Sequence, residues 1–295
     1  MISLSDLIKE SRKIEIKANG LVDDNLNGEY KTAFKGRGID FHDLREYSHG
    51  DEVRTIDWNT TARTGEPYVK QFVEQRELTI YIAIDISKSN NYGSVIKSRH
   101  HLAALISAVL SRSATKNGDR VGFVLFGDKI EQYSEPQKGL PNSMKMLRKL
   151  LKSDCMTSTS RPDLALEFIM KRQKKRSMIF LISDFLCPEF ENSLKVCSFK
   201  NEIISIQIID PTEIELPNVG KVYLSNPEND KTYLVDTSNK NFRNNFKKTR
   251  DLWQTKLDKL FKSSNVDHIK LVNDADCDPA KTLKALFKSR ASSKT

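Results

Sequence analysis

The sequence DISKSN, at residues 85–90, puts a carboxylate and two hydroxyls on alternate residues directly after an apolar run. That run, TIYIAI, is typical of a buried strand. Polar groups at the end of such a strand cost free energy when they are buried without partners. Asp85, Ser87 and Ser89 therefore predict a place where the chain holds something.

A second carboxylate lies at the end of another apolar run. In RSMIFLISDF, Ser183 and Asp184 end a predicted core strand. The hydroxyl-rich sequence TSTSRPD, at 157–163, lies between the two runs and precedes a predicted helix. Ligands of open α/β sheets bind at the carboxyl ends of strands, where strand order reverses, so we expect these three segments to meet.

The donors in these segments are all oxygens, without a nearby His or Cys, which favours Mg²⁺, Mn²⁺ or Ca²⁺ over zinc. Asp and Ser after a strand are also ordinary turn formers and helix N-caps. DISKSN alone is therefore a weak signal, and the second aspartate at a strand end strengthens it.

The elements that must position these residues alternate along the chain from residue 79. Continuous apolar runs predict strands at 79–85, 120–128, 177–184 and 202–210. Apolar stripes with helical spacing predict helices at 95–115, 141–152 (begun by Pro141), 163–173 and 189–198. This order predicts an α/β fold, a mostly parallel central sheet flanked by helices on both faces.

The C-terminal part is expected to complete that domain. A hairpin at a sheet edge is predicted over 219–236, a long helix follows, and 268–272 and 278–290 are a last strand and helix before a frayed tail. The long helix carries an apolar stripe of Phe242, Phe246, Trp253, Leu257 and Leu260.

Residues before 79 have a different pattern. Residues 5–16 are predicted to form a short amphipathic helix, and the GRG, HG and TG turns within 28–76 indicate an irregular, β-rich and non-helical segment. We therefore divide the chain into an N-terminal helix and β-rich segment packed on the main domain (1–77), an α/β core (78–212), and an edge hairpin with a C-terminal helical extension (213–295).

The arginines and histidines of 36–63 admit two interpretations. They could clamp phosphate or carboxylate, or act in catalysis. A structural role is favoured, with Arg45–Asp51 and Arg54–Asp57 as local ion pairs. Aromatic side chains would then dock the segment onto the sheet, and these are Phe41, Tyr47 and Trp58. The pair His100 and His101 is expected at the solvent or its boundary.

Composition limits the class of protein. The chain has 295 residues, 38% of them hydrophobic and 29% charged, with a net charge of +9, so it is expected to fold rather than remain disordered. The basic excess permits nucleic-acid binding, but no basic motif interleaved with aromatics is present, and we expect no nucleic-acid partner.

The four cysteines form no CxxC pair, which suits free thiols in a reducing compartment. No run approaches the roughly 18–20 apolar residues that span a bilayer, and the N-terminus does not have the pattern of a signal peptide. A cytoplasmic protein without direct membrane insertion is expected.

The DxSxS pattern of Asp85, Ser87 and Ser89 resembles the metal-ion-dependent adhesion site of von Willebrand factor A domains, whose fold is Rossmann-like. Asp184 is similar to the aspartate of that site's third loop. The second loop of the family normally carries a Thr, and the register places Ser160 there, with Thr159 as a fallback. The resemblance thus implies Mg²⁺ or Mn²⁺ held by Asp85, Ser87, Ser89, Ser160 and Asp184.

The segment at 36–77, GRGIDFHDLREYSHGDEVRTIDWNTTARTGEPYVKQFVEQRE, resembles closely the signature of the domain-of-unknown-function-58 family. The matching residues are Gly36, Arg37, Gly38, Phe41, Leu44, Arg45, Tyr47, Gly50, Asp51, Arg54, Ile56, Asp57, Trp58, Ala62 and Arg63. The resemblance covers roughly residues 10–290. It implies a MoxR-associated, non-enzymatic module that works with a MoxR-type AAA+ ATPase on a client protein and grips a partner carboxylate through the metal.

Two other functions remain as alternatives. Two carboxylates around a metal could activate water, which would make the protein a hydrolase. The sequence offers no glycine-rich phosphate loop and no GxSxG elbow for such chemistry. A basic nucleic-acid-binding protein is the other alternative, and strongly salt-dependent retention on heparin or DNA would identify it.

Overall fold

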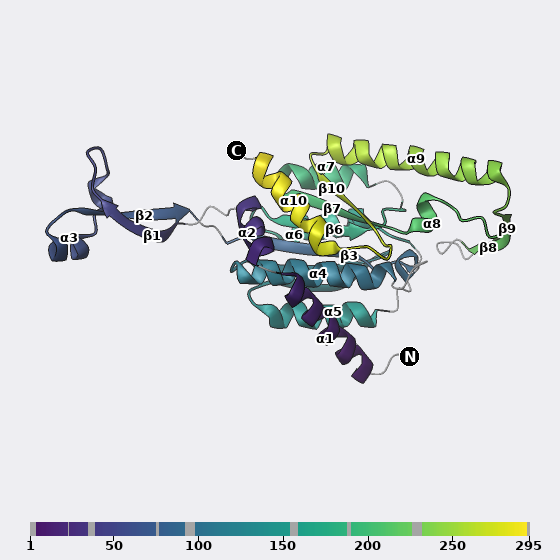
Figure 1. Cartoon of the computed structure of the whole chain (residues 1–295), viewed down its shortest axis with the longest axis horizontal. Helices are drawn as coiled ribbons and strands as arrows, with labels where there is room; N and C mark the ends of the chain where they lie inside the picture. The colour runs from purple at the N-terminus through teal and green to yellow at the C-terminus, as the bar shows by residue number, and fades with distance from the viewer. Residues whose placement is uncertain are drawn as a thin grey trace.

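A six-stranded sheet forms the centre of the computed structural model, which describes residues 4–22, 24–34, 39–74, 77–91, 98–153, 159–187, 190–225 and 232–293. The strands are β3 (Thr79–Asp85), β4 (Arg120–Phe126), β5 (Ile130–Gln137), β6 (Met178–Ser183), β7 (Glu202–Ile209) and β10 (Asp267–Val272). Their order across the sheet is β10-β7-β6-β3-β4-β5, and every pairing is parallel except that of β5 with β4. This is the doubly wound order, and the expected α/β fold is confirmed (Figure 1).

Helices cover both faces of the sheet. One face carries α1 (Leu4–Leu21), α2 (Asp24–Ala33), α4 (Arg99–Lys116), α5 (Leu140–Lys152) and α10 (Pro279–Ser293), and the other carries α6 (Pro162–Arg172), α7 (Glu191–Lys200) and α9 (Lys240–Ser263). Side chains of β3 alternate between the two cores: Ile82 packs with the first set and Tyr81 with the second. Because both faces are buried, β3 has a continuous apolar run.

The N-terminal region differs from the sequence prediction. The helix expected at 5–16 continues to Leu21, and α2 makes residues 28–33 helical instead of β-rich. Both helices pack against the sheet body, α1 on α4 and α5 and α2 on α10. They complete the hydrophobic core of the α/β domain.

The family-signature segment forms a separate arm. It pairs β1 (Ile39–Glu46) with β2 (Tyr68–Glu74) in an antiparallel sheet and also contains α3 (Trp58–Thr64). Figure 1 shows this arm standing away from the body, and Trp58 is 65% exposed, so the expected docking of Trp58 onto the sheet is not found in the described part of the chain; the side chain of Phe41 lies outside it. The residues of the arm instead pack against one another and bury Val69, which is 4% exposed. The expected Arg45–Asp51 pair is present, with two contacts of 2.6 and 2.7 Å.

The hairpin at 219–236 is present as β8 (Lys221–Ser225) and β9 (Thr232–Asp236), but it forms its own two-stranded sheet instead of extending the central one. The edge strands of the central sheet are β10 and β5, and sequence reasoning missed β5 because IEQYSEPQ is polar and only half-buried. Sequence reasoning also missed the short helix α8 (Pro211–Ile214), and the expected frayed tail is helical as far as Ser293. The division of the chain at residues 77 and 212 stays a prediction.

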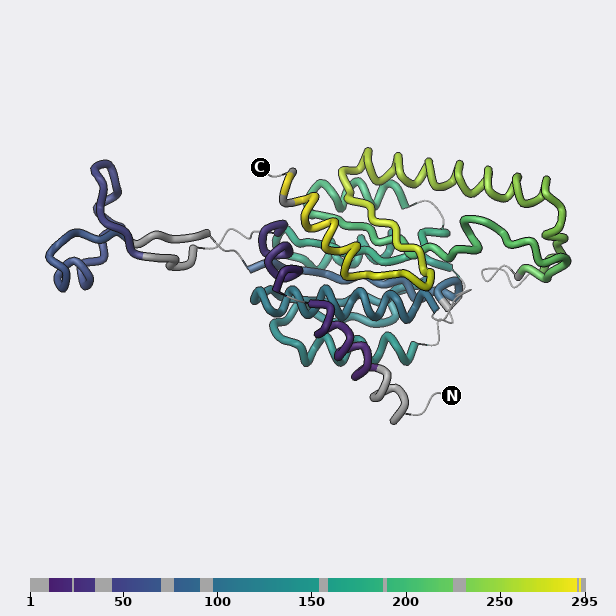
Figure 2. The backbone as a smooth tube through the Cα atoms, viewed as in Figure 1, coloured from purple at the N-terminus to yellow at the C-terminus, as the bar shows by residue number. Residues whose placement is uncertain are grey.

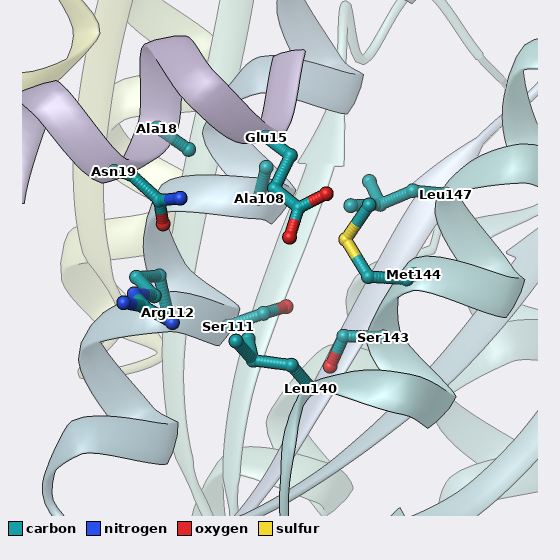
Figure 3. Close-up of a pocket in the computed structure, with 10 residues that line it drawn as sticks. All are labelled: Glu15, Ala18, Asn19, Ala108, Ser111, Arg112, Leu140, Ser143, Met144 and Leu147. Atoms are coloured by element: carbon teal, nitrogen blue, oxygen red, sulfur yellow. The ribbon is translucent and has the colours of Figure 1, made fainter. Parts of the chain in front are cut away.

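A small cavity lies between α1, α4 and α5 (Figure 3). Its volume is about 10 Å³, which is room for one water molecule and not for an organic ligand. Arg112 and Ser143 are among its lining residues, and Arg112 Nε and Ser143 Oγ are buried without a hydrogen bond to the described part of the protein.

Candidate metal centre

Asp85 ends β3 at the point where the strand order reverses. β3 pairs with β4 on one side and with β6 on the other, so the carboxyl ends of β3 and β6 border the crevice in which doubly wound sheets bind ligands. The register Ile84↔Ile182 places Asp85 beside Ser183. The Asp85 side chain is 1% exposed.

Three donors surround the Asp85 carboxylate. Its Oδ2 accepts hydrogen bonds from Ser160 Oγ at 2.7 Å and Ser183 Oγ at 2.6 Å, and its Oδ1 accepts one from the Ser87 backbone N at 2.8 Å. The loop that carries Ser160 is fixed to the end of β4, since Arg161 N donates to Gly127 O at 2.9 Å. The second-loop hydroxyl beside Asp85 thus belongs to Ser160, as the sequence register predicts.

The other two predicted hydroxyls lie together. Ser87 Oγ and Ser89 Oγ are 3.1 Å apart, and Asn90 Nδ2 donates to Ser87 Oγ at 3.3 Å. Ser87 is buried, whereas Ser89 is half-buried. The hydroxyl group of Ser89 is therefore the more accessible of the two to solvent or to a partner.

Asp184 is held by a buried arginine. Arg99 Nη1 donates to Asp184 Oδ2 at 2.7 Å, and the backbone N of Leu186 donates to Oδ1 at 2.9 Å. Arg99 also forms an ion pair with Glu213 of α8, and Glu213 lies 3.6 Å from Arg250 of α9. Asp184 thus belongs to a chain of alternating charges that links the end of β6 to α4, α8 and α9.

The electrostatics of this region favour a cation. Burial, followed by the charge of Asp184, raises the pKa of Asp85 to about 6. Burial also raises the pKa of Glu213. Asp184 and Glu213 pair with the guanidinium groups of Arg99 and Arg250, whereas the buried Asp85 has no ion pair with a cationic side chain among the described residues.

The backbone after Asp184 is strained. Phe185 has a φ of 59°, a left-handed conformation that costs a residue with a Cβ roughly 1–2 kcal/mol. Its N donates to Ser183 Oγ at 2.9 Å, and its ring stacks on Phe190 and packs edge-on against Phe261. Such conformations cluster at functional sites, where the surrounding packing maintains them.

The donor set fits a hard divalent cation. Asp85 supplies a carboxylate and Ser87, Ser89 and Ser160 supply hydroxyl oxygens, the ligand types of Mg²⁺ and Mn²⁺. Asp184 fits less directly, because its ion pair with Arg99 already neutralises much of its charge. Within the described ranges, no three His, Cys, Asp or Glu side chains gather as they would at a zinc-type site. Metal binding by the five predicted residues stays a prediction.

Three residues of this region were missed by sequence reasoning: Arg99, Glu213 and Arg250. The sequence places Ser183 beside Asp184 at a strand end but does not predict its hydrogen bond to Asp85. The sequence carries no signal for the burial of Arg99, because a charged residue beside two histidines normally indicates an exposed helix face. The expectation for His100 is wrong for the same reason: it is 7% exposed, and its Nε2 lies 2.7 Å from Leu150 O.

The strand order, the helices on both faces and the Asp-Ser-Ser loop at the switch point define a von Willebrand factor A-like α/β protein. The chain belongs to the family described as "Protein of unknown function DUF58", whose model matches residues 43–255. An uncharacterized protein of Mycobacterium tuberculosis is 29% identical over 220 residues, which cover 74% of this chain and 69% of the relative.

Solved structures show weaker similarity. An aerotolerance-related membrane protein from Bacteroides fragilis has 15% identity and a TM-score of 0.47, over 73% of this chain and 99% of the other. Proximal thread matrix protein 1 from the mussel byssus, with a zinc-occupied MIDAS motif, has 14% identity and a TM-score of 0.37, over 45% of this chain and 38% of the other. The fold assignment rests on the strand order and not on these similarities. In the part of the chain that the structure describes, no helix has the length and apolar character needed to cross a membrane.

Proposed function

We propose that this chain is a non-enzymatic, metal-dependent module that binds a carboxylate of a protein partner. The observation that carries the proposal is the buried Asp85 carboxylate, which lies at the sheet's switch point and accepts hydrogen bonds from Ser160 and Ser183. A bound Mg²⁺ or Mn²⁺ would supply a positive charge with positions open to an incoming carboxylate.

The residues of the chain have separable roles in this proposal. Asp85 holds the metal, and Ser87, Ser89 and Ser160 offer hydroxyl lone pairs to it. Asp184 has an indirect electrostatic role, because Arg99 neutralises much of its charge. With Asp85 as the carboxylate that holds it, a divalent metal would retain positive charge, and this would attract an anionic ligand from the partner.

The partner that the family resemblance favours is a MoxR-type AAA+ ATPase, in the maturation or remodelling of a client protein in the cytoplasm. The test of this part is binding of the purified ATPase by biolayer interferometry, in Mg²⁺ and in EDTA. We expect binding in Mg²⁺ that EDTA or the Asp85→Ala variant abolishes. Equal binding by the wild type in both buffers would refute the metal-dependent grip.

The metal itself is tested by thermal melting with EDTA, Mg²⁺ or Mn²⁺. A ligand that binds only the folded state at 100 times its Kd stabilises that state by about 2.7 kcal/mol. We expect a rise in Tm for the wild type and none for Asp85→Ala. The matched control is Asp128→Ala, since Asp128 lies just after the carboxyl end of neighbouring β4 but is exposed. A rise that Asp85→Ala retains would place the metal elsewhere.

The hydrolase alternative has less support. A general base needs a carboxylate with an available oxygen, and Asp184 is paired with Arg99 and accepts from Leu186 N. Turnover of a generic phosphoester, abolished by Asp184→Ala, would revive it.

A further inference from the structure

Exposed apolar side chains gather in one stretch of the chain after the sheet's fourth parallel strand. Within residues 214–234, five large apolar side chains are 40–75% exposed: Ile214, Val219, Tyr223, Tyr233 and Leu234. Single exposed apolar residues are ordinary, but a group of them in one short segment marks a candidate interaction surface.

The β8–β9 hairpin concentrates this apolar surface. Tyr223 and Leu234 lie directly opposite each other in the register and therefore share one face, and they are 75% and 58% exposed. Leu224 and Tyr233 form the neighbouring pair, on the other face. Within the described residues, β8 and β9 pair only with each other, which leaves two open edges, and such a ribbon is marginally stable alone.

The hairpin lies at the end of the sheet that carries the candidate metal centre. Figure 1 shows β8 and β9 at the end of the molecule opposite to the arm of β1 and β2, beyond the carboxyl ends of the central strands, and Figure 2 follows the same course of the backbone. The connection to the metal centre is also chemical, because Glu213, directly before Ile214, forms an ion pair with Arg99, which holds Asp184.

The helix that follows the hairpin is basic at its start. The segment Lys240–Thr249 of α9 contains four basic side chains, Lys240, Arg243, Lys247 and Lys248, and no acidic one. Arg243 Nη1 donates to Thr237 O at 2.5 Å, which fixes the first turn of α9 to the end of β9. An apolar hairpin beside a positively charged helix turn is complementary to a surface that is both apolar and acidic.

We propose that the β8–β9 hairpin and the first turns of α9 dock an extended, acidic segment with apolar side chains from the protein partner. The inference rests on the proposed function, in which the metal centre takes a carboxylate of the same partner. The open strand edges suit the addition of a strand, and the alternate side chains of that strand would contact the Tyr223–Leu234 face.

An anionic membrane is a poorer occupant of this surface. The hydrocarbon of a bilayer cannot satisfy the backbone groups of open strand edges, whereas a peptide strand does.

The test is a selection of phage-displayed 12-residue peptides on the immobilised full chain, followed by Kd measurement of the enriched peptides. We expect enriched peptides to combine Asp or Glu with apolar residues. The double variant Tyr223→Ser/Leu234→Ser should weaken their binding by at least about tenfold. Lys247→Glu/Lys248→Glu, which leaves the hairpin itself intact, should do the same, and Phe199→Ser is the matched control, since that side chain is 91% exposed on α7.

Three results would overturn the proposal: no enriched acidic and apolar peptides, binding that both double variants retain, or sedimentation with phosphatidylserine vesicles that the double variants lose. Measurements on Asp85→Ala separate this proposal from the metal-dependent function. Peptide binding that survives in Asp85→Ala and EDTA supports the docking surface even if the metal proposal fails. A metal-dependent rise in Tm without peptide binding leaves the function and removes the docking surface.

Discussion

Replacing Arg99 by Met tests the buried charges behind the metal centre. Arg99 is 2% exposed and neutralises two carboxylates, Asp184 at 1% and Glu213 at 17% exposure. Removing one partner of a buried pair leaves uncompensated charge and typically costs about 3–5 kcal/mol. Met retains much of the arginine's apolar stem, so the expected loss is mainly electrostatic.

The assay is urea unfolding at pH 7, followed by circular dichroism. Arg120→Met is the matched control, because the Arg120 and Glu77 side chains form an ion pair that is 54% and 34% exposed. Such surface pairs contribute about 0–1 kcal/mol. We expect the free energy of unfolding to fall several times further for Arg99→Met than for Arg120→Met.

The same variant tests the role of Asp184. Without Arg99, the Asp184 carboxylate is free to approach a cation, so Mg²⁺ should raise the Tm of Arg99→Met more than that of the wild type. Equal losses of stability in Arg99→Met and Arg120→Met would refute the electrostatic reasoning. An equal Mg²⁺ effect in the wild type and Arg99→Met would refute the competition between Arg99 and the metal.

Three further predictions concern single contacts. Ser160→Ala should lose the hydrogen bond to Asp85, at a cost of about 1.5–3 kcal/mol, and should also lose the metal-induced rise in Tm. Ser160→Thr should keep both the hydrogen bond and the rise in Tm, and thermal melting with and without Mg²⁺ tests this. Gly122→Ala should destabilise the folded protein by about 1–3 kcal/mol, because a Cβ at this position would lie 2.9 Å from backbone atoms of β5. Gly20→Ala is the control, since a Cβ at Gly20 meets nothing within 4 Å, and urea unfolding of both variants measures the difference. Burial raises the pKa of Asp119 to about 6 from 3.8, so the folded state binds its proton more tightly than the unfolded state does. The resulting stability is present below pH 4 and is lost as pH rises through 6, by about 3 kcal/mol. Urea unfolding between pH 4 and 7 should show a larger loss of stability in the wild type than in Asp119→Asn, in which the raised pKa values of Asp85 and Glu213 still contribute, and parallel curves would contradict the role of Asp119.

The sheet could be predicted from the sequence because its strands are buried on both faces. The runs IYIAI and MIFLI are hydrophobic throughout, and such runs favour a strand buried on both faces. β5 could not be predicted from the sequence, because an edge strand is exposed to solvent and its residues need not be apolar. The helix α2, at DNLNGEYKTA, was not predicted, because Gly and Asn have low helix propensity and weaken its helical pattern. Tertiary packing buries its residues Leu26 and Tyr30.

The candidate site was predictable only in part. Asp85, Ser160 and Asp184 follow strands or precede a helix, so local pattern places them. Arg99 could not be found in this way, because its partners Asp184 and Glu213 are distant along the chain. A buried charge is identified by what surrounds it in three dimensions, and a single sequence carries no such signal at Arg99.

The contact between α2 and α10 has a consequence for how the protein comes to be folded. Tyr30 and Phe34 pack edge-on against Phe287, with ring centroids 5.5 and 5.1 Å apart, and Arg290 lies over the Phe34 ring. During synthesis, α2 leaves the ribosome long before α10 exists, so Tyr30 and Phe34 lack this cover until translation has passed Phe287. Closure of this face is therefore late, and such dependence on distant contacts slows folding and prolongs the exposure of aggregation-prone surface. Truncation before α10 should leave a protein that needs chaperones to stay in solution.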